Sequence, residues 1–384
     1  MKILSLMTAL SVMCVASATF AESKKIASTQ AQGDQTQFSY LLAPDADVML
    51  ADVGAVVASK SHYQTVYGYG LKKGIGVATD GDEAIVQLTL IPGRLGKAGI
   101  QTSMMPTHLT IASGAKAMNA KDEAMALMAD APKLYSGTRV FKVAKELGAG
   151  ELKLSSLSWV NPSDRFVLYV LDKNSDTRLN LASNRMSLAG GERLKVSTFL
   201  DGLNSQLLST RAKLKAPDGR SYIVQGKTQG NQFDAYYDLN LDAQRKPGEL
   251  WQLEVVSQYK SQRGHRVTRT ASVALDVHQA SAKLVSIDQS SGQLAAHLQV
   301  EQTGRYEVRA YVYGRNNLGL KTPALVSYTA ENLDTGSQLM PLNIDFKQLA
   351  ASGLQAPFTI EGVQLLDQGQ MAVLATEQKA ITLH

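Results

Sequence analysis

Short runs in which apolar and polar residues alternate dominate the sequence from Phe38 onward and constrain the fold more than any other feature. Residues 86–90, for example, alternate valine and leucine with polar residues before Pro92-Gly93 ends the run. Alternation with period two places every second side chain on one face of a strand, while proline and glycine favour turns. The pattern therefore predicts a mostly β protein whose strands each bury one face.

Residues 119–131 are the exception and predict one short helix. Asn119 has the side chain of a helix N-cap, Asp122 and Glu123 fall in the first turn, and Pro132 follows the end. Acidic side chains near a helix N-terminus interact favourably with the helix dipole, and proline does not continue a helix.

The N-terminus has the order of features of a secretory signal peptide. Lys2 precedes an apolar stretch over 3–15, and small residues follow as far as Ala21. Cleavage near Ala21 would remove residues 1–21, including Cys14, the only cysteine. The mature chain then has no disulfide or thiolate zinc site, no transmembrane segment, and an expected location in the periplasm or outside the cell.

Breaks in the pattern predict how the mature chain is divided. Residues 22–37 are polar and predict a flexible leader, and residues 38–160 predict a β-rich N-terminal domain with one short helix. Turns every eight to fifteen residues over 161–277 are typical of an immunoglobulin-like β-sandwich. The apolar run 166–171 is expected to be a central strand of that sandwich, and residues 278–384 predict a second one.

Three phrases carry a resemblance to a known family. Lys-Ala-Pro-Asp-Gly-Arg at 215–220, Pro-Gly-Glu-Leu-Trp-Gln-Leu-Glu-Val at 247–255 and Gly-Arg-Tyr-Glu-Val-Arg-Ala-Tyr-Val-Tyr-Gly at 304–314 resemble bacterial immunoglobulin-like modules of exported proteins. The layout over roughly residues 40–384 is similar to the uncharacterised exported family called domain of unknown function 4785. The resemblance implies a fold and a compartment, and it transfers no catalytic residue.

Local catalytic and cofactor motifs are missing from the sequence: there is no Gly-x-Ser-x-Gly, no Walker loop and no His-Glu-x-x-His. Residues 68–74 are rich in glycine but lack the spacing of a dinucleotide loop, and they predict a strand and a turn. Residues 172–176 begin like a calcium loop, yet Thr177 and Ser183 replace the required glycine and glutamate. We therefore interpret them as a turn and expect no cofactor and no metal.

Two kinds of side chain remain as candidates for binding. The basic candidates, on one strand face and one hairpin, are Arg211, Lys213, Lys215, Lys260, Arg263 and Arg266. The aromatic candidates, expected on outward strand faces, are Tyr63, Tyr67, Tyr69, Tyr311 and Tyr313. The alternatives are an ordinary solvated surface for the basic set and burial at a domain junction for the tyrosines.

The sequence thus predicts an exported non-enzymatic β-sandwich protein that binds a protein or an envelope polysaccharide through sheet faces or edges. Nucleic acid is not an expected partner, because the net charge of +5 is modest and the compartment argues against it. The alternative is a secreted hydrolase whose site is assembled in the N-terminal domain from residues distant in sequence. A pocket with convergent titratable groups would favour the hydrolase.

Overall fold

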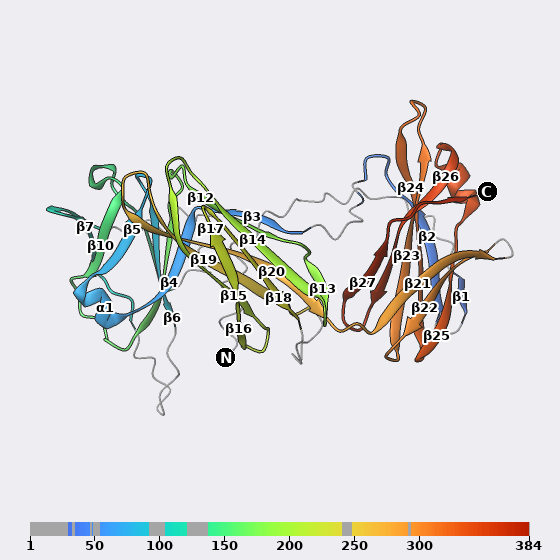
Figure 1. Cartoon of the computed structure of the whole chain (residues 1–384), viewed down its shortest axis with the longest axis horizontal. Coiled ribbons are helices and arrows are strands. Elements are labelled where there is room, and N and C mark those ends of the chain that lie inside the picture. Colours follow the sequence, from blue (N-terminus) through green and yellow to red (C-terminus); the bar gives the residue numbers. More distant parts are fainter. Residues whose placement is uncertain are drawn as a thin grey trace.

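A computed structural model describes residues 30–32, 35–46, 48, 54–91, 104–120, 137–239, 248–290 and 293–383. It confirms the mostly β fold: three β-sandwich domains follow one another along the molecule (Figure 1). Among the described residues, no helix is both long and apolar enough to cross a membrane. The predicted signal peptide, 1–21, and residues 121–131 of the predicted helix lie outside the described residues.

The first domain packs two four-stranded sheets against each other. One sheet has the order β4 (Ser61–Tyr67), β11 (Arg165–Leu171), β6 (Ile85–Ile91) and β9 (Thr138–Lys142). The other has the order β5 (Ile75–Thr79), β10 (Gly150–Ser156), β7 (Leu109–Ser113) and β8 (Lys116–Asn119). Their alternate apolar residues form one core, which also buries Leu71 of the short helix α1 (Gly68–Lys73). The 3-10 helix η3 (Lys145–Leu147) precedes β10.

The middle domain packs two five-stranded sheets around Trp251. One has the order β17 (Gly226–Gln229), β18 (Gln232–Asp238), β14 (Arg193–Asp201), β12 (Arg178–Ser183) and β3 (Val56–Ser59). The other has the order β13 (Ser187–Ala189), β20 (Arg266–His278), β19 (Trp251–Lys260), β15 (Gln206–Lys215) and β16 (Ser221–Val224).

The last domain packs a seven-stranded sheet on a three-stranded one. The larger sheet has the order β1 (Gln30–Gln32), β2 (Gln35–Leu41), β24 (Lys321–Leu333), β23 (Gly304–Arg315), β26 (Gln355–Asp367) and β27 (Ala372–Glu377), and β28 (Ile381–Leu383) also pairs with β26. The smaller sheet has the order β21 (Ala282–Ser290), β22 (Gln293–Val300) and β25 (Gly336–Leu342). The helix α3 (Phe346–Ala351) is capped by the carboxylate of Asp345, which accepts hydrogen bonds from two backbone amides.

The N-terminal part of the chain contributes a strand to each domain. Strand β2 pairs with β24 of the last domain, β3 pairs with β12 of the middle domain, and β4 pairs with β11 of the first. Phe38 and Tyr40 of β2 stack on Tyr328 of β24, with ring centroids 4.7 and 5.6 Å apart. The flexible leader expected over 22–37 is therefore wrong for residues 35–37, which belong to an ordered ladder.

Three further expectations need correction. The run 166–171 is central, as predicted, but its strand β11 pairs with β4 and β6 and so completes the first domain instead of opening the second. Asn119 is the last residue of strand β8 and not the first residue of a helix, and the predicted helix from residue 121 onward lies outside the described residues. Residues 68–73 form helix α1 instead of a strand and turn. Gly68 allows this helix to sit close to the chain before β11, because a Cβ there would lie 2.0 Å from the carbonyl oxygen of Asn161.

Candidate binding surface

A buried ion pair joins the first and middle domains. The guanidinium of Arg269 on β20 lies 2.7 Å from the carboxylate of Asp172, which follows β11, and both side chains are 0% exposed. The same carboxylate accepts hydrogen bonds from the amides of Asp80, at 2.7 Å, and Gly81, at 3.0 Å. The guanidinium also lies over the ring of Tyr259, 5.5 Å from its centroid. Asp172, Asp80 and Gly81 follow strands of the first domain, whereas Arg269 and Tyr259 lie on β20 and β19 of the middle domain. The network therefore fixes the two domains against each other.

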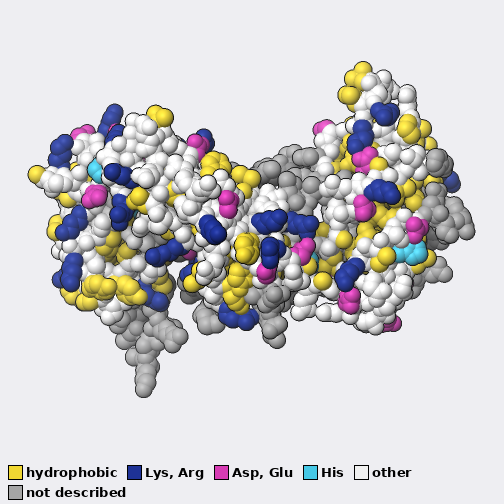
Figure 2. Space-filling view, in the orientation of Figure 1, with side chains coloured by type: hydrophobic (Ala, Val, Ile, Leu, Met, Phe, Trp, Pro, Cys, Tyr) yellow, Lys and Arg dark blue, Asp and Glu magenta, His cyan; other side chains and the backbone are white. Residues whose placement is uncertain are grey.

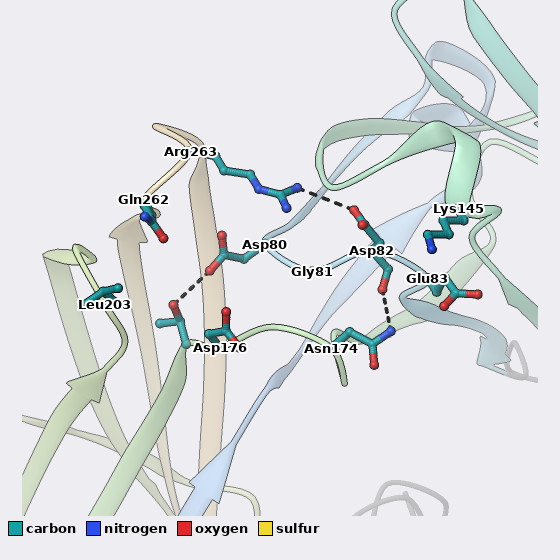
Figure 3. Close-up of a pocket in the computed structure, with 11 residues that line it drawn as sticks. Asp80, Gly81, Asp82, Glu83, Lys145, Asn174, Asp176, Leu203, Gln262 and Arg263 are labelled. Carbon is teal, nitrogen blue, oxygen red and sulfur yellow. Dashed lines mark hydrogen bonds and ion pairs between the residues drawn. The ribbon is translucent and has the colours of Figure 1, made fainter.

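A polar cavity of about 280 Å³ lies beside this network (Figure 3). Its lining residues come from turns of both domains: Asp80, Gly81, Asp82, Glu83, Lys145, Asn174, Asp176, Thr177, Leu203, Gln262 and Arg263. Several titratable groups converge here, which is the arrangement that the hydrolase alternative requires.

Three carboxylates of this cavity are held by hydrogen bonds or ion pairs within the protein. Asp80 accepts a hydrogen bond from the hydroxyl of Thr177 at 2.9 Å, and Asp82 lies 3.6 Å from the guanidinium of Arg263. The hydrogen bond and charge of Lys142 hold the pKa of Glu83 below its ordinary value, so Glu83 stays ionised, whereas a general acid needs a raised pKa. No three His, Asp or Glu side chains among the described residues form a metal-binding group.

His62 on β4 is buried near the same junction and gives a testable pH dependence. Burial, and secondarily the charge of Arg269, lower its pKa from 6.5 to about 4. Between these values the unfolded chain binds a proton that the folded chain does not, so the stability due to neutral His62 is present above pH 6.5 and is lost toward pH 4. The expected loss is about 3 kcal/mol.

The measurement is urea unfolding of the wild type and of His62→Phe across this pH range. The stability difference between the two proteins should change by that amount, whereas the control His108→Gln, at an exposed histidine, should follow the wild type. A difference that stays constant with pH would contradict a buried neutral imidazole.

The predicted basic residues do not form one patch. Arg211 and Lys213 are exposed on the outer face of β15, as expected, and Lys215 on the same face pairs with Glu254 at 2.9 Å. Arg211 pairs in register with Val256, which is four residues, or about 13 Å, from Lys260 along β19.

One residue of the hairpin that follows β19 contacts the first domain at the domain junction. Lys260 and Arg266 are exposed where β19 and β20 meet at this hairpin, but Arg263 at its tip faces the carboxylate of Asp82. Figure 2 accordingly shows cationic side chains over the middle of the molecule interspersed with acidic and apolar ones.

Two of the five predicted tyrosines, Tyr63 and Tyr313, contact a charged side chain on another strand. The hydroxyl of Tyr63 donates to the carboxylate of Glu254 in the middle domain, and burial raises its pKa, so Tyr63 lies at the domain junction. Tyr311 and Tyr313 point outward from β23, as predicted, but are only partly exposed. The ammonium of Lys321 lies 5.0 Å from the ring centroid of Tyr313.

Tyr67 and Tyr69 form an exposed aromatic pair at one end of the first domain. Tyr67 is the last residue of β4, and Tyr69 lies in α1, so they do not share a strand face as expected. Their rings are stacked nonetheless, with centroids 5.7 Å apart and an interplanar angle of 21°. They are 43% and 55% exposed, which leaves ring surface open to a partner.

The backbone around this pair is firmly anchored. The amide of Gly68 donates to the carbonyl of Asp164 at 2.9 Å, and that of Tyr69 donates to the carbonyl of Pro162 at 3.2 Å. Leu71 is 0% exposed and fixes α1 on the core. The two rings are therefore presented by a preorganised support, which reduces the entropy lost on binding.

Cationic side chains surround the pair. Lys72 and Lys73 are exposed and follow Tyr69 by three and four residues, which places them on the same side of α1. Arg165 is exposed and pairs with Tyr67 across β4 and β11, so the two side chains share a sheet face. We call Tyr67, Tyr69, Lys72, Lys73 and Arg165 the aromatic-basic surface. Figure 2 shows apolar side chains gathered at this end of the molecule, where α1 lies.

Family models match both ends of the chain. The N-terminal domain model of domain of unknown function 4785 (DUF4785) matches residues 27–172, and the C-terminal domain model matches residues 270–384. The chain belongs to the DUF4785 family. The resemblance inferred from the sequence is thereby confirmed, and the N-terminal model ends at Asp172, where β11 leads into the domain junction.

A solved structure supports the DUF4785 fold. The crystal structure of a DUF4785 family protein from Legionella pneumophila subsp. pneumophila str. Philadelphia 1 is similar with a TM-score of 0.73 and 19% identity, covering 94% of this chain and 98% of that one. A structure of a 1.5-MDa bacterial ice-binding adhesin aligns over 86% of this chain and 97% of the adhesin chain at 10% identity. Its TM-score of 0.18 is too low to indicate a common fold. No curated protein matches the chain.

Sequence reasoning found the two tyrosines of the aromatic-basic surface and missed its cations in this DUF4785 protein. Lys72 and Lys73 would have been assigned had residues 68–73 been recognised as a helix, since their spacing from Tyr69 is helical. Arg165 carried no local signal, because its proximity to Tyr67 depends on a strand pair nearly one hundred residues apart in sequence.

Proposed function

We propose that this protein is an exported, non-enzymatic binding protein that holds an envelope polysaccharide at the aromatic-basic surface. The observation that carries the proposal is the stacked, solvent-open pair of Tyr67 and Tyr69. Flat aromatic faces pack against the C–H faces of sugar rings, and tyrosine gives large contact area at low entropy cost. The order of charge, apolar core and small residues over 1–21 supports export to the compartment where such polymers occur.

The contacts that the titratable groups of the junction cavity make within the protein favour binding over hydrolysis. The junction cavity has the titratable residues that a hydrolase needs, but Asp80, Asp82 and Glu83 are held by Thr177, Arg263 and Lys142. The stacked tyrosines, in contrast, lie on a rigid support, and the exposed part of each ring is open to a partner.

The test is binding of the mature protein to immobilised polysaccharides purified from a bacterial envelope. The double variant Tyr67→Ala, Tyr69→Ala should lose at least about 2 kcal/mol of binding free energy, as expected for two central aromatic contacts. Because both side chains are exposed, its unfolding free energy should change by less than about 1 kcal/mol.

The matched control is Tyr236→Ala. Tyr236 is 58% exposed on the middle domain and also lies beside a cation, with the guanidinium of Arg193 4.6 Å from its ring centroid. This variant should bind like the wild type. Equal binding by the double variant and the wild type, or no binding by the wild type to any of the polymers, would overturn the proposed function.

A further inference from the structure

The charges around the tyrosine pair define which class of polysaccharide fits. Resting on the proposed function, we infer that the aromatic-basic surface selects an acidic polysaccharide whose sugars carry carboxylates. The two rings provide the stacking platform, and Lys72, Lys73 and Arg165 provide the positive charge that would meet those carboxylates.

Elsewhere among the described residues, the cations that lie over aromatic rings form ion pairs with carboxylates. Four cations lie over aromatic rings among the described residues, and each has a carboxylate partner: Arg193 with Asp238, Arg269 with Asp172, Arg309 with Glu307 and Lys321 with Glu361. Those places therefore offer little net charge to an anionic ligand.

The aromatic-basic surface differs in this respect. Within the part of the chain that the structure describes, Lys72, Lys73 and Arg165 take part in no ion pair. The neighbouring carboxylate of Asp164 is only 5% exposed and accepts a hydrogen bond from the amide of Met104 at 3.3 Å. Three exposed positive charges thus flank the stacked rings without a carboxylate to offset them.

The same residues argue against the other anionic macromolecules. Nucleic-acid binding of useful strength generally rests on about six to ten neutralised phosphates, well above the three cations present. A membrane-binding helix exposes an apolar face to lipid, whereas the one large aliphatic side chain of α1, Leu71, is buried in the core of its own domain. A sugar polymer with a carboxylate on each ring needs only a short row of stacking and charged contacts.

The experiment compares two probes that differ only at their carboxyl groups: polygalacturonate, which is charged, and its methyl ester, which is neutral. The mature wild type should bind polygalacturonate more tightly, and added salt should remove most of the difference because the cations are exposed. The variant Lys72→Gln, Lys73→Gln, Arg165→Gln should bind polygalacturonate roughly tenfold more weakly and bind the methyl ester like the wild type. The control Arg211→Gln, Lys213→Gln, which removes exposed charge from the middle domain, should leave both affinities unchanged.

The outcomes separate this inference from the proposed function. Equal binding of both probes that still depends on Tyr67 and Tyr69 would overturn the acidic specificity and leave the proposed function standing. Binding of neither probe would overturn the acidic specificity, whereas the proposed function is overturned only if the wild type also fails to bind the envelope polysaccharides. Tighter binding of single-stranded DNA or of anionic lipid vesicles than of polygalacturonate, abolished by the same glutamine variant, would replace the polysaccharide by that ligand and overturn the inference.

Discussion

Replacing Asp172 by alanine is expected to lower the free energy of unfolding by about 3–5 kcal/mol, since the change leaves Arg269 charged, buried and without its carboxylate. The amides of Asp80 and Gly81 lose their acceptor at the same time. The loss should appear in the urea unfolding transition of the mature protein. It should be accompanied by faster proteolysis at the junction, because the pair holds two domains together.

Two comparisons make this prediction specific. Asp176→Ala removes an exposed carboxylate four residues away and should cost less than about 0.5 kcal/mol. Combining Asp172→Ala with Arg269→Met should cost less than the sum of the single changes, because the second change removes the unpaired buried charge. Strict additivity would show that the two side chains do not stabilise the junction as a pair.

Removing the chain before Leu42 is expected to destabilise the last domain by at least about 3 kcal/mol, although that domain lies at the other end of the sequence. The deletion removes the ladder between β2 and β24 and the stacking of Phe38 and Tyr40 on Tyr328. It also leaves β24 as an unpaired edge, which favours association of copies. Limited proteolysis followed by mass spectrometry should show cleavage within 321–333, and light scattering should show oligomers.

The control for this deletion is a mature chain that begins at Gln30, which keeps both N-terminal strands and should behave like the full mature protein. If the chain beginning at Leu42 retained the same melting behaviour and stayed monomeric under conditions in which the control is monomeric, the strands β1 and β2 would contribute nothing to the last domain.

The fold could be predicted from the sequence as far as local periodicity determines it. Alternation gave the faces of strands such as β6 and β15 because it reports which side of a strand is buried. It does not report which sheet a strand joins. For this reason the pattern assigns β2, β3 and β11 to the wrong domain, because their partners lie in segments that only the folded chain brings near.

In the candidate site, too, the sequence predicts features that depend on neighbouring residues and misses those that depend on residues far apart in the chain. The sequence predicts Tyr67 and Tyr69 as candidates because their spacing of two residues would place both on one outward strand face, although Tyr69 lies in α1. Helix α1 was missed because Gly68 and Gly70 have low helix propensity, and burial of Leu71 against the core outweighs it. The pairing of Asp172 with Arg269, 97 residues apart, gives no pattern at either position.

Hydroxyl-radical footprinting of the mature protein with and without bound polygalacturonate tests the location of the binding surface most directly. Tyr67 and Tyr69 should become protected from oxidation on binding, while Tyr236 on the middle domain, which is more exposed than either, should not change. Protection of Tyr236 with no change at Tyr67 and Tyr69 would contradict the assignment of the aromatic-basic surface.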